Sequence, residues 1–227
     1  MPAPNDLVYA FIGSYFARRG FVVVIPDYRL VPNVRFPGQA EDVRNAAIWT
    51  IKNPELLTTA CSPNPDVQNI YLMGHSAGAS NAFTAVVLPD NEDSAVLRRN
   101  IAGLILSAGV HSLHDLPPDS SFWDVLADYC GGREKIEAST SLALFRSAAD
   151  SVISSLPKLL IVEAEREPDW LLAAGKKFRD ALEARTGKKV ELIVGKGHNH
   201  ISGNLALGTG QGEEWAEEVL KWIGISK

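Results

Sequence analysis

The sequence has little that would connect it to an oxidising compartment or to a metal. It contains only two cysteines, Cys61 and Cys130, which lie far apart in the chain. This favours two reduced thiols over a disulfide framework. There is no Asn-x-Ser/Thr acceptor, no His-x-x-x-His pair and no paired-cysteine spacing. We therefore expect neither a metal site nor a cofactor held by such residues.

There is also no excess of positive charge. The net charge is −5, and Lys and Arg form no run anywhere in the 227 residues, which argues against a nucleic-acid partner and favours a small-molecule ligand. The N-terminal region has no basic segment before its apolar residues, and Arg18-Arg19 interrupt them. We expect no signal peptide and no membrane span. The prediction is a cytoplasmic protein with one globular domain over residues 1–227.

Apolar runs and helix-type patterns alternate along the chain, which predicts an α/β fold with a mainly parallel sheet and helices on both faces. The run Phe21–Ile25 is continuously apolar and β-branched, as in a strand that is buried on both faces. The other expected strands are 69–73, 101–106, 158–162 and 190–194. The expected helices are 5–19, 40–51, 170–185 (stopped by Gly187) and 213–223.

Two connections differ from the rest. The acidic stretch from Pro89 to Asp93 is most simply a solvated loop. The segment from about residue 111 to 155 contains Pro117-Pro118 and Gly131-Gly132, and it is too long for a plain connection between core elements. We expect it to form a cap over a pocket.

One motif points to chemistry. Gly74-His75-Ser76-Ala77-Gly78 has the form Gly-x-Ser-x-Gly and lies between an apolar strand and an alanine-rich helix. This context places Ser76 at a tight strand-to-helix turn. Such a turn strains the serine backbone, so Gly74 and Gly78 are expected to be glycine because side chains there would clash.

Candidate partners for Ser76 follow later strands, where function gathers in parallel sheets. Carboxylates at Glu163, Glu165, Glu167 and Asp169 follow the strand 158–162. His198 and His200 follow the strand 190–194. A serine hydroxyl needs an imidazole to take its proton, and the imidazole needs a carboxylate to orient it. The chain order is serine, acid, histidine, and the spacing alone leaves both the acid and the histidine undecided.

This order and the Gly-x-Ser-x-Gly motif resemble the α/β-hydrolase superfamily. The stretch Val22 to Pro32, Phe36-Pro37 and the helix from Glu41 to Trp49 are similar to the esterase/lipase branch. That branch includes kynurenine-formamidase-like and feruloyl-esterase-like enzymes and prenylcysteine methylesterases. The likeness extends from about residue 6 to 223.

The resemblance implies roles for particular residues. Gly197 to Ser202 looks like the family's turn around the catalytic histidine and implies His200 as base, whereas a generic Gly-x-Gly-His turn would imply His198. Glu165-Arg166-Glu167-Pro168 is similar to a Glu-x-Asp-Pro pattern and implies Glu167 as acid, with Asp169 as competitor. The N–H of Ala77 would be an oxyanion donor.

The resemblance also implies a departure. Family members carry a His-Gly-Gly segment that supplies a second oxyanion donor, and this sequence has none. We therefore expect an N-terminally shortened α/β-hydrolase fold, or a fragment of a longer chain. The implied activity is a serine hydrolase for a carboxylic ester or small amide, with no cofactor. The alternative is a catalytically impaired relative that only binds its ligand.

Overall fold

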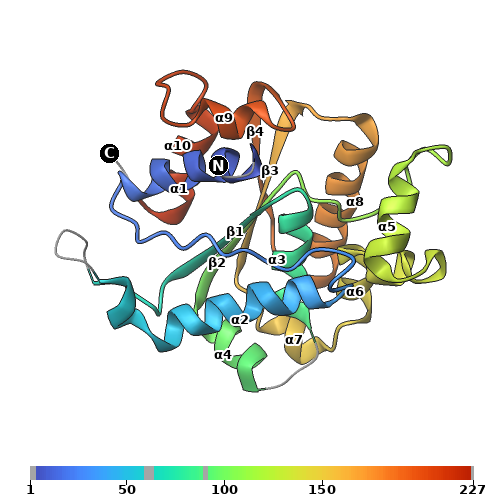
Figure 1. Cartoon of the computed structure of the whole chain (residues 1–227), viewed down its shortest axis with the longest axis horizontal. Coiled ribbons are helices and arrows are strands. Elements are labelled where there is room, and N and C mark those ends of the chain that lie inside the picture. Colours follow the sequence, from blue (N-terminus) through green and yellow to red (C-terminus); the bar gives the residue numbers. More distant parts are fainter. Residues whose placement is uncertain (1–3, 59–63, 89–91, 226–227) are drawn as a thin grey trace.

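The structure is a computed structural model that describes residues 4–58, 64–88 and 92–225 (Figure 1). Cys61 and residues 89–91 of the acidic connection therefore lie outside the described residues. No helix in these three ranges is both long and apolar enough to cross a membrane. The longer helices are α1 (Pro4–Ala17), α2 (Gly38–Lys52), α3 (Ala77–Val87), α4 (Glu92–Asn100), α5 (Phe122–Cys130), α8 (Asp169–Thr186) and α10 (Glu214–Ile223). The short ones are η1 (Pro54–Leu57), η2 (Arg133–Lys135), η3 (Glu137–Ser139), α6 (Ser141–Ser147), α7 (Asp150–Ser154) and α9 (Ser202–Ala206).

Four strands form one parallel sheet in the order β1 (Ile70–His75), β2 (Ile101–Ser107), β3 (Lys158–Arg166) and β4 (Glu191–Asn199). Register pairs include Met73 with Ile105 and Ile105 with Leu160. The predicted α/β class, the parallel sheet and four of the five expected strands are confirmed. Because all four strands run the same way, their carboxyl ends lie at one edge of the sheet.

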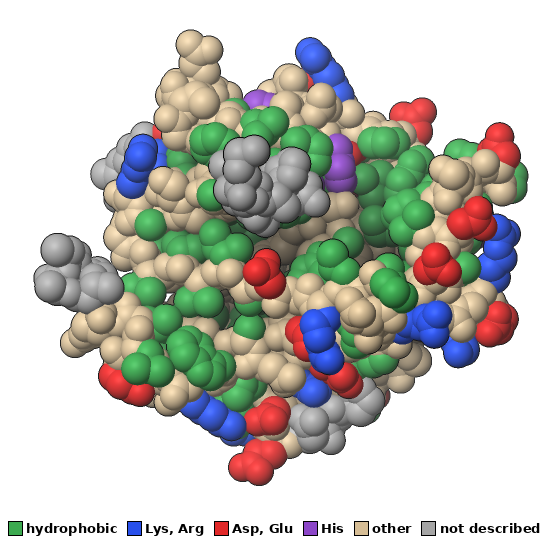
Figure 2. Space-filling view, in the orientation of Figure 1, with side chains coloured by type: hydrophobic (Ala, Val, Ile, Leu, Met, Phe, Trp, Pro, Cys, Tyr) green, Lys and Arg blue, Asp and Glu red, His purple; other side chains and the backbone are tan. Residues whose placement is uncertain are grey.

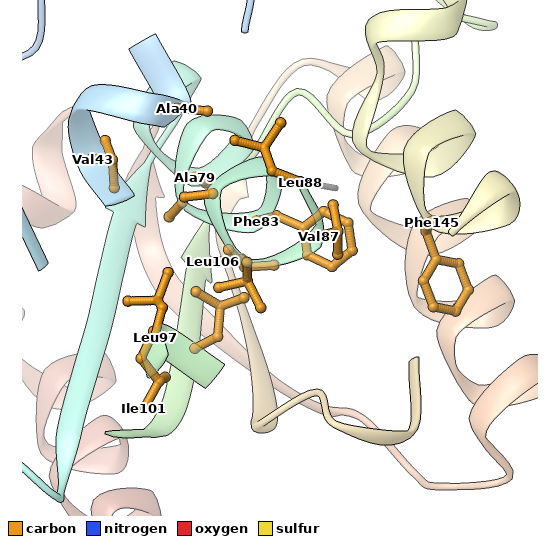
Figure 3. Packing of buried hydrophobic residues seen from close by; sticks show 14 of the residues in the cluster. Ala40, Val43, Ala79, Phe83, Val87, Leu88, Leu97, Ile101, Leu106 and Phe145 are labelled. Carbon is orange, nitrogen blue, oxygen red and sulfur yellow. The ribbon is translucent and has the colours of Figure 1, made fainter. Parts of the chain in front are cut away.

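The sheet separates two hydrophobic clusters, and helices cover both of its faces (Figure 1). Alternate residues of a strand point to opposite faces. Thus Leu104 and Leu106 pack with α2, α3 and α8, whereas Ile105 packs with α1 and α10. Figure 3 shows Phe83 and Val87 of α3 beside Leu106, at the centre of the larger cluster. This two-sided burial explains why the strand sequences are continuously apolar.

The expected strand at Phe21–Ile25 is wrong. Residues 21–30 form no helix or strand in the structure, and Val24 and Ile25 are 39% and 54% exposed. The segment lies against α1 instead: Phe21 packs edge-on against Phe16, and Ile25 lies close to Gly13. A strand needs a partner for its backbone groups, and within the described residues the sheet ends at β1.

The segment 111–155 is mostly helical rather than irregular. Its second half packs into the larger cluster, α6 through Leu142 and Phe145 and α7 through Val152 and Ile153. Its first half forms a separate small cluster around Leu116 and Cys130, which also receives Trp170 from α8. A cap is therefore a proposal for the first half only. The expected acidic loop is also partly wrong, because Glu92 and Asp93 begin α4.

Candidate active site

The Ser76 turn has an unusual backbone. Ser76 follows β1 and precedes α3, and its φ of 54° and ψ of −122° lie outside the regions that ordinary residues adopt. Its N–H donates to the carbonyl of Ser107 at 2.9 Å. This bond fastens the turn to the end of β2. The strain is therefore held in place by the sheet, and strain of this kind is commonly found at functional sites.

The two motif glycines differ in their surroundings. A Cβ built on Gly74 would lie 2.3 Å from the carbonyl oxygen of Gly78, so a side chain cannot fit at Gly74. A Cβ on Gly78 would meet nothing within 4 Å. The expectation that both glycines are needed to avoid clashes therefore holds for Gly74 and is wrong for Gly78.

Three predicted site residues lie together at the carboxyl ends of the strands. The Oγ atom of Ser76, after β1, is 3.0 Å from Nε2 of His200, after β4. The Nδ1 atom of His200 is 2.9 Å from Oε2 of Glu167, after β3. The Glu167 side chain is only 1% exposed, and that of His200 is 31% exposed. The imidazole thus bridges the hydroxyl to a buried carboxyl group.

These contacts determine the hydrogen-bond directions. A carboxylate only accepts, so Nδ1 of His200 carries the proton and donates it to Glu167. In the neutral ring, Nε2 then has a free lone pair. It accepts the hydrogen bond from the Ser76 hydroxyl. This is the tautomer in which His200 can remove the serine proton.

The competing residues lie elsewhere. His198 uses both ring nitrogens within its own C-terminal region, at 3.2 Å from Oγ of Ser202 and 2.8 Å from the carbonyl of Gly212. Asp169 is the first residue of α8. Among the described residues, neither His198 nor Asp169 forms a hydrogen bond with Ser76 or with the side chain of His200.

The remaining carboxylates of the acidic cluster have other surroundings. Glu165 accepts from the N–H of Gly197 and from Lys196, and these bonds hold its pKa below the usual value. Glu163 is partly buried, and burial raises its pKa, although Arg179 opposes the shift. Its carboxylate packs close to Gly175 of α8.

His75, next to the nucleophile position, is buried and is in contact with His200. Its Nε2 lies 2.8 Å from the backbone carbonyl of His200, and the two imidazole centroids are 4.7 Å apart. Its Nδ1 lies 3.3 Å from the hydroxyl of Tyr9, on α1. Sequence reasoning missed Tyr9, because it belongs to no motif and lies 66 residues from His75.

Ala77 is the first residue of α3. The first N–H groups of a helix have no partner within the helix, and the helix dipole makes this end attractive to negative charge. Ala77 directly follows Ser76 in the sequence. Its N–H therefore lies at the N-terminal end of α3, where the helix dipole attracts negative charge. An oxyanion formed on a group attached to Ser76 would develop near this donor.

The sequence matches the family described as alpha/beta hydrolase fold over residues 6–202, which is most of the chain. The chain belongs to the alpha/beta hydrolase fold family. This agrees with the parallel sheet and with the serine at the strand-to-helix turn, and it confirms the resemblance at the level of the family.

Several relatives of this α/β hydrolase carry esterase names. A probable isoprenylcysteine alpha-carbonyl methylesterase from Oryza sativa subsp. japonica is 24% identical over 202 residues, which are 84% of this chain and 46% of that protein. The chain thus spans about half the length of this curated relative. The butyrate-bound esterase Est2 from Thermogutta terrifontis is 24% identical, with a TM-score of 0.59 over 87% of this chain and 70% of that one. Carboxyl esterase 2 from Tuber melanosporum is 19% identical, with a TM-score of 0.65 over 97% of this chain and 72% of that one. At these identities the solved structures show a shared fold.

A small cavity adjoins Glu167 and His200 of this α/β hydrolase. Glu167, His75, Asn204 and Trp215 are among the residues that line it, and its volume is about 20 Å³, room for about one water molecule. Among the described residues, Oε1 of Glu167 and Nδ2 of Asn204 have no hydrogen-bond partner. Both unpartnered atoms therefore belong to residues that line a water-sized space.

The surface near the site is partly apolar. Figure 2 shows a hollow beside a histidine side chain, bordered by hydrophobic side chains. Trp170, three residues after Glu167 in the chain, packs against Phe122 of the small cluster. Within residues 4–58, 64–88 and 92–225, no three His, Cys, Asp or Glu side chains gather as metal ligands would.

Proposed function

We propose that this α/β hydrolase cleaves a carboxylic ester or a small amide through a Ser76–His200–Glu167 triad. The observation that carries the proposal is the continuous pair of short contacts, 3.0 Å from Ser76 to His200 and 2.9 Å from His200 to Glu167. The strained backbone of Ser76 at the start of α3 supports it, since this presents the hydroxyl beside free N–H groups.

The proposed reaction has two stages. In the first, Oγ of Ser76 attacks the substrate carbonyl while Nε2 of His200 takes the hydroxyl proton. Glu167 stabilises the imidazolium, and the N–H of Ala77 donates to the oxyanion. The tetrahedral intermediate collapses, His200 gives its proton to the leaving alcohol or amine, and the acyl group remains on Ser76. In the second stage, water attacks the acyl-enzyme with His200 again as base, and the carboxylic acid leaves.

The substrate class rests on two arguments. The esterase and methylesterase names of the relatives favour an ester over a peptide. The apolar side chains near the site favour an acyl or aryl group of modest size. The triad chemistry itself requires no cofactor.

A second candidate is an impaired relative that binds a ligand without turning it over. The observation that favours it is that Ala77 is the one oxyanion donor we can assign among the described residues, where the sheet ends at β1. Loss of one such donor typically lowers kcat by about 10²–10³.

Hydrolysis of p-nitrophenyl butyrate tests the proposed activity. We expect turnover by the chain and its loss, by at least about 10³-fold, in Ser76→Ala. Ser80→Ala is the matched control, because Ser80 lies on the same helix and its hydroxyl donates to the carbonyl of Val110. Equal turnover by Ser76→Ala and by the unchanged chain would refute the proposal that this chain is a serine hydrolase acting through Ser76. Binding of the ester without turnover would favour the second candidate function, in which the protein binds its ligand without cleaving it.

A further inference from the structure

We propose that His75 is a positioning residue that holds the catalytic imidazole in place by donating a hydrogen bond to the backbone carbonyl of His200, with Tyr9 fixing the tautomer that makes this possible. The inference rests on the proposed function of His200 as base. It adds a function for the residue before the nucleophile and for a tyrosine of α1.

The hydrogen-bond chemistry has one consistent arrangement. The carbonyl of His200 only accepts, so Nε2 of His75, 2.8 Å away, carries the proton. In the neutral ring, Nδ1 then accepts, and the hydroxyl of Tyr9 at 3.3 Å donates to it. Two consecutive hydrogen bonds thus connect Tyr9 to His75 and His75 to the main chain of His200. They link α1 to the turn after β4.

The charge of His75 suits this position. Its burial lowers its pKa to about 4, and repulsion from His200 acts in the same direction, while the bond to the His200 carbonyl and the charge of Glu167 oppose the shift. The facing hydroxyl of Tyr9 is neutral as well, and burial raises its pKa further above the ordinary value. A neutral ring therefore lies 4.7 Å from the imidazole that becomes positive during the reaction. A charged donor there would repel that imidazolium.

The turn that carries His200 is held from two sides. On one side, the Asn199 side-chain oxygen accepts from the N–H groups of Ile201 and Ser202. On the other side, His75 holds the carbonyl of His200. Without the His75 bond, this carbonyl would lose its fixed orientation, and the imidazole would move relative to Ser76. A displacement of about 1 Å can cost about 10²-fold in rate.

Kinetics with substitutions of different shape test the donor function. His75→Phe keeps the bulk and removes the donor, and we expect kcat to fall roughly 10- to 100-fold with KM changed less than about threefold. His75→Gln places an amide N–H near the Nε2 position and should restore kcat to within about fivefold of the unchanged chain. Tyr9→Phe should have a smaller effect than His75→Phe. His114→Phe and His114→Gln are matched controls, because the His114 side chain is 77% exposed.

The kcat and KM values of the His75 variants decide whether His75 acts as a positioning residue. Unchanged kcat in His75→Phe would overturn this inference, and so would His75→Gln as slow as His75→Phe at equal folded fraction. An increase in KM alone would indicate that His75 contacts substrate instead, which also overturns it.

A second measurement is independent of turnover, so that failure of the proposed function can be recognised separately. Long-range ¹H–¹⁵N spectra of histidine-labelled protein, recorded in the Ser76→Ala background, report tautomer and charge for each ring. We expect His75 to carry its proton on Nε2 and to stay neutral from pH 8 down to about pH 5, since its pKa is lowered to about 4. An Nδ1–H tautomer, or a ring that is protonated at pH 6, would overturn the inference even if the ester assay succeeds.

Discussion

At the residue scale, the site is built from groups that are far apart in the chain. Ser76 and His200 are separated by 124 positions, and His200 and Glu167 by 33. Parallel strands bring them together, because each residue follows the carboxyl end of a strand in the same sheet. The short contacts are therefore a consequence of the sheet rather than of local sequence.

The acid can be tested with a matched pair of substitutions. We predict that Glu167→Gln lowers kcat by about 10²–10⁴, because the amide no longer supports the required tautomer of His200. Asp169→Asn should stay within about threefold of the unchanged chain, since Asp169 begins α8. Steady-state ester hydrolysis by the two variants checks this. The reverse order of effects would assign the acid to Asp169.

The candidate site could be predicted only in part. Chain order and strand ends identify Ser76 and a small set of acids and histidines. The choice between Glu167 and Asp169 depends on the path of the loop, which turns at Pro168 so that Glu167 precedes the helix and Asp169 enters it. Tyr9 could not be predicted, because its contact with His75 comes from the packing of α1 and leaves no sequence pattern.

A buried histidine away from the proposed triad gives a pH prediction. His111 is 1% exposed, its ring stacks on Phe178 at 4.3 Å, and neither ring nitrogen has a partner among the described residues. Burial lowers its pKa to about 3. Below the unfolded-state pKa of about 6.5, the unfolded chain takes up a proton that the folded chain refuses. The folded state therefore loses stability as the pH falls.

We predict that the free energy of unfolding decreases from pH 6 to pH 4, by up to about 1.4 kcal/mol per pH unit for this one group. His111→Leu should make the decrease less steep, and His75, whose pKa is also lowered, should account for part of the remaining slope. Urea unfolding at several pH values measures both slopes. Identical slopes in the variant and the unchanged chain would contradict the burial of His111 in its neutral form.

At the scale of elements, the strand-to-helix turn depends on one glycine more than on the other. We predict that Gly74→Ala lowers the free energy of unfolding by about 2–4 kcal/mol, because its Cβ would collide with the backbone at Gly78. Gly78→Ala should be neutral or stabilising by up to about 1 kcal/mol, because its Cβ meets nothing and alanine favours the helix. Urea unfolding of the two variants, at fixed pH, provides the comparison. Equal losses would mean that Gly78 is also closely packed.

The elements that could be predicted are those with a strong pattern. β2 and β3 are buried on both faces and read as continuous apolar runs, and α8 ends at Gly187, whose φ of 67° suits glycine. By contrast, α4 consists largely of polar residues, and Leu97 is the one hydrophobic residue among the three that it buries, so its sequence resembles a solvated loop. The helices α6 and α7 have seven and five residues, too few to show a clear period.

At the scale of the whole molecule, the sheet formed by the described residues has one strand fewer than the apolar sequence indicated. The run Phe21–Ile25 has the composition of a buried strand, but strand formation depends on a neighbour, and composition does not reveal whether one is present. In the structure the segment rests on α1 and exposes much of Val23, Val24 and Ile25. This is the main difference between the predicted and the observed fold.

Replacing an exposed and a buried isoleucine with alanine tests whether the segment 21–25 is a buried strand. Ile25 is 54% exposed, whereas Ile105 in β2 is 2% exposed. We predict that Ile25→Ala costs less than about 1 kcal/mol of unfolding free energy, and that Ile105→Ala costs about 2–5 kcal/mol. Urea unfolding measures both. A cost at Ile25 as large as that at Ile105 would show that the segment 21–25 is a buried strand in solution.

Covalent labelling tests the proposal that Ser76 is a nucleophile activated by His200. A fluorophosphonate reacts when the serine oxygen displaces fluoride from phosphorus. We predict one adduct per chain by intact mass, mapped to Ser76 by peptide sequencing, absent in Ser76→Ala and formed at least about 10²-fold more slowly in His200→Ala. A folded chain that forms no adduct, or one that carries the adduct on another residue, would contradict the proposal that Ser76 is the nucleophile.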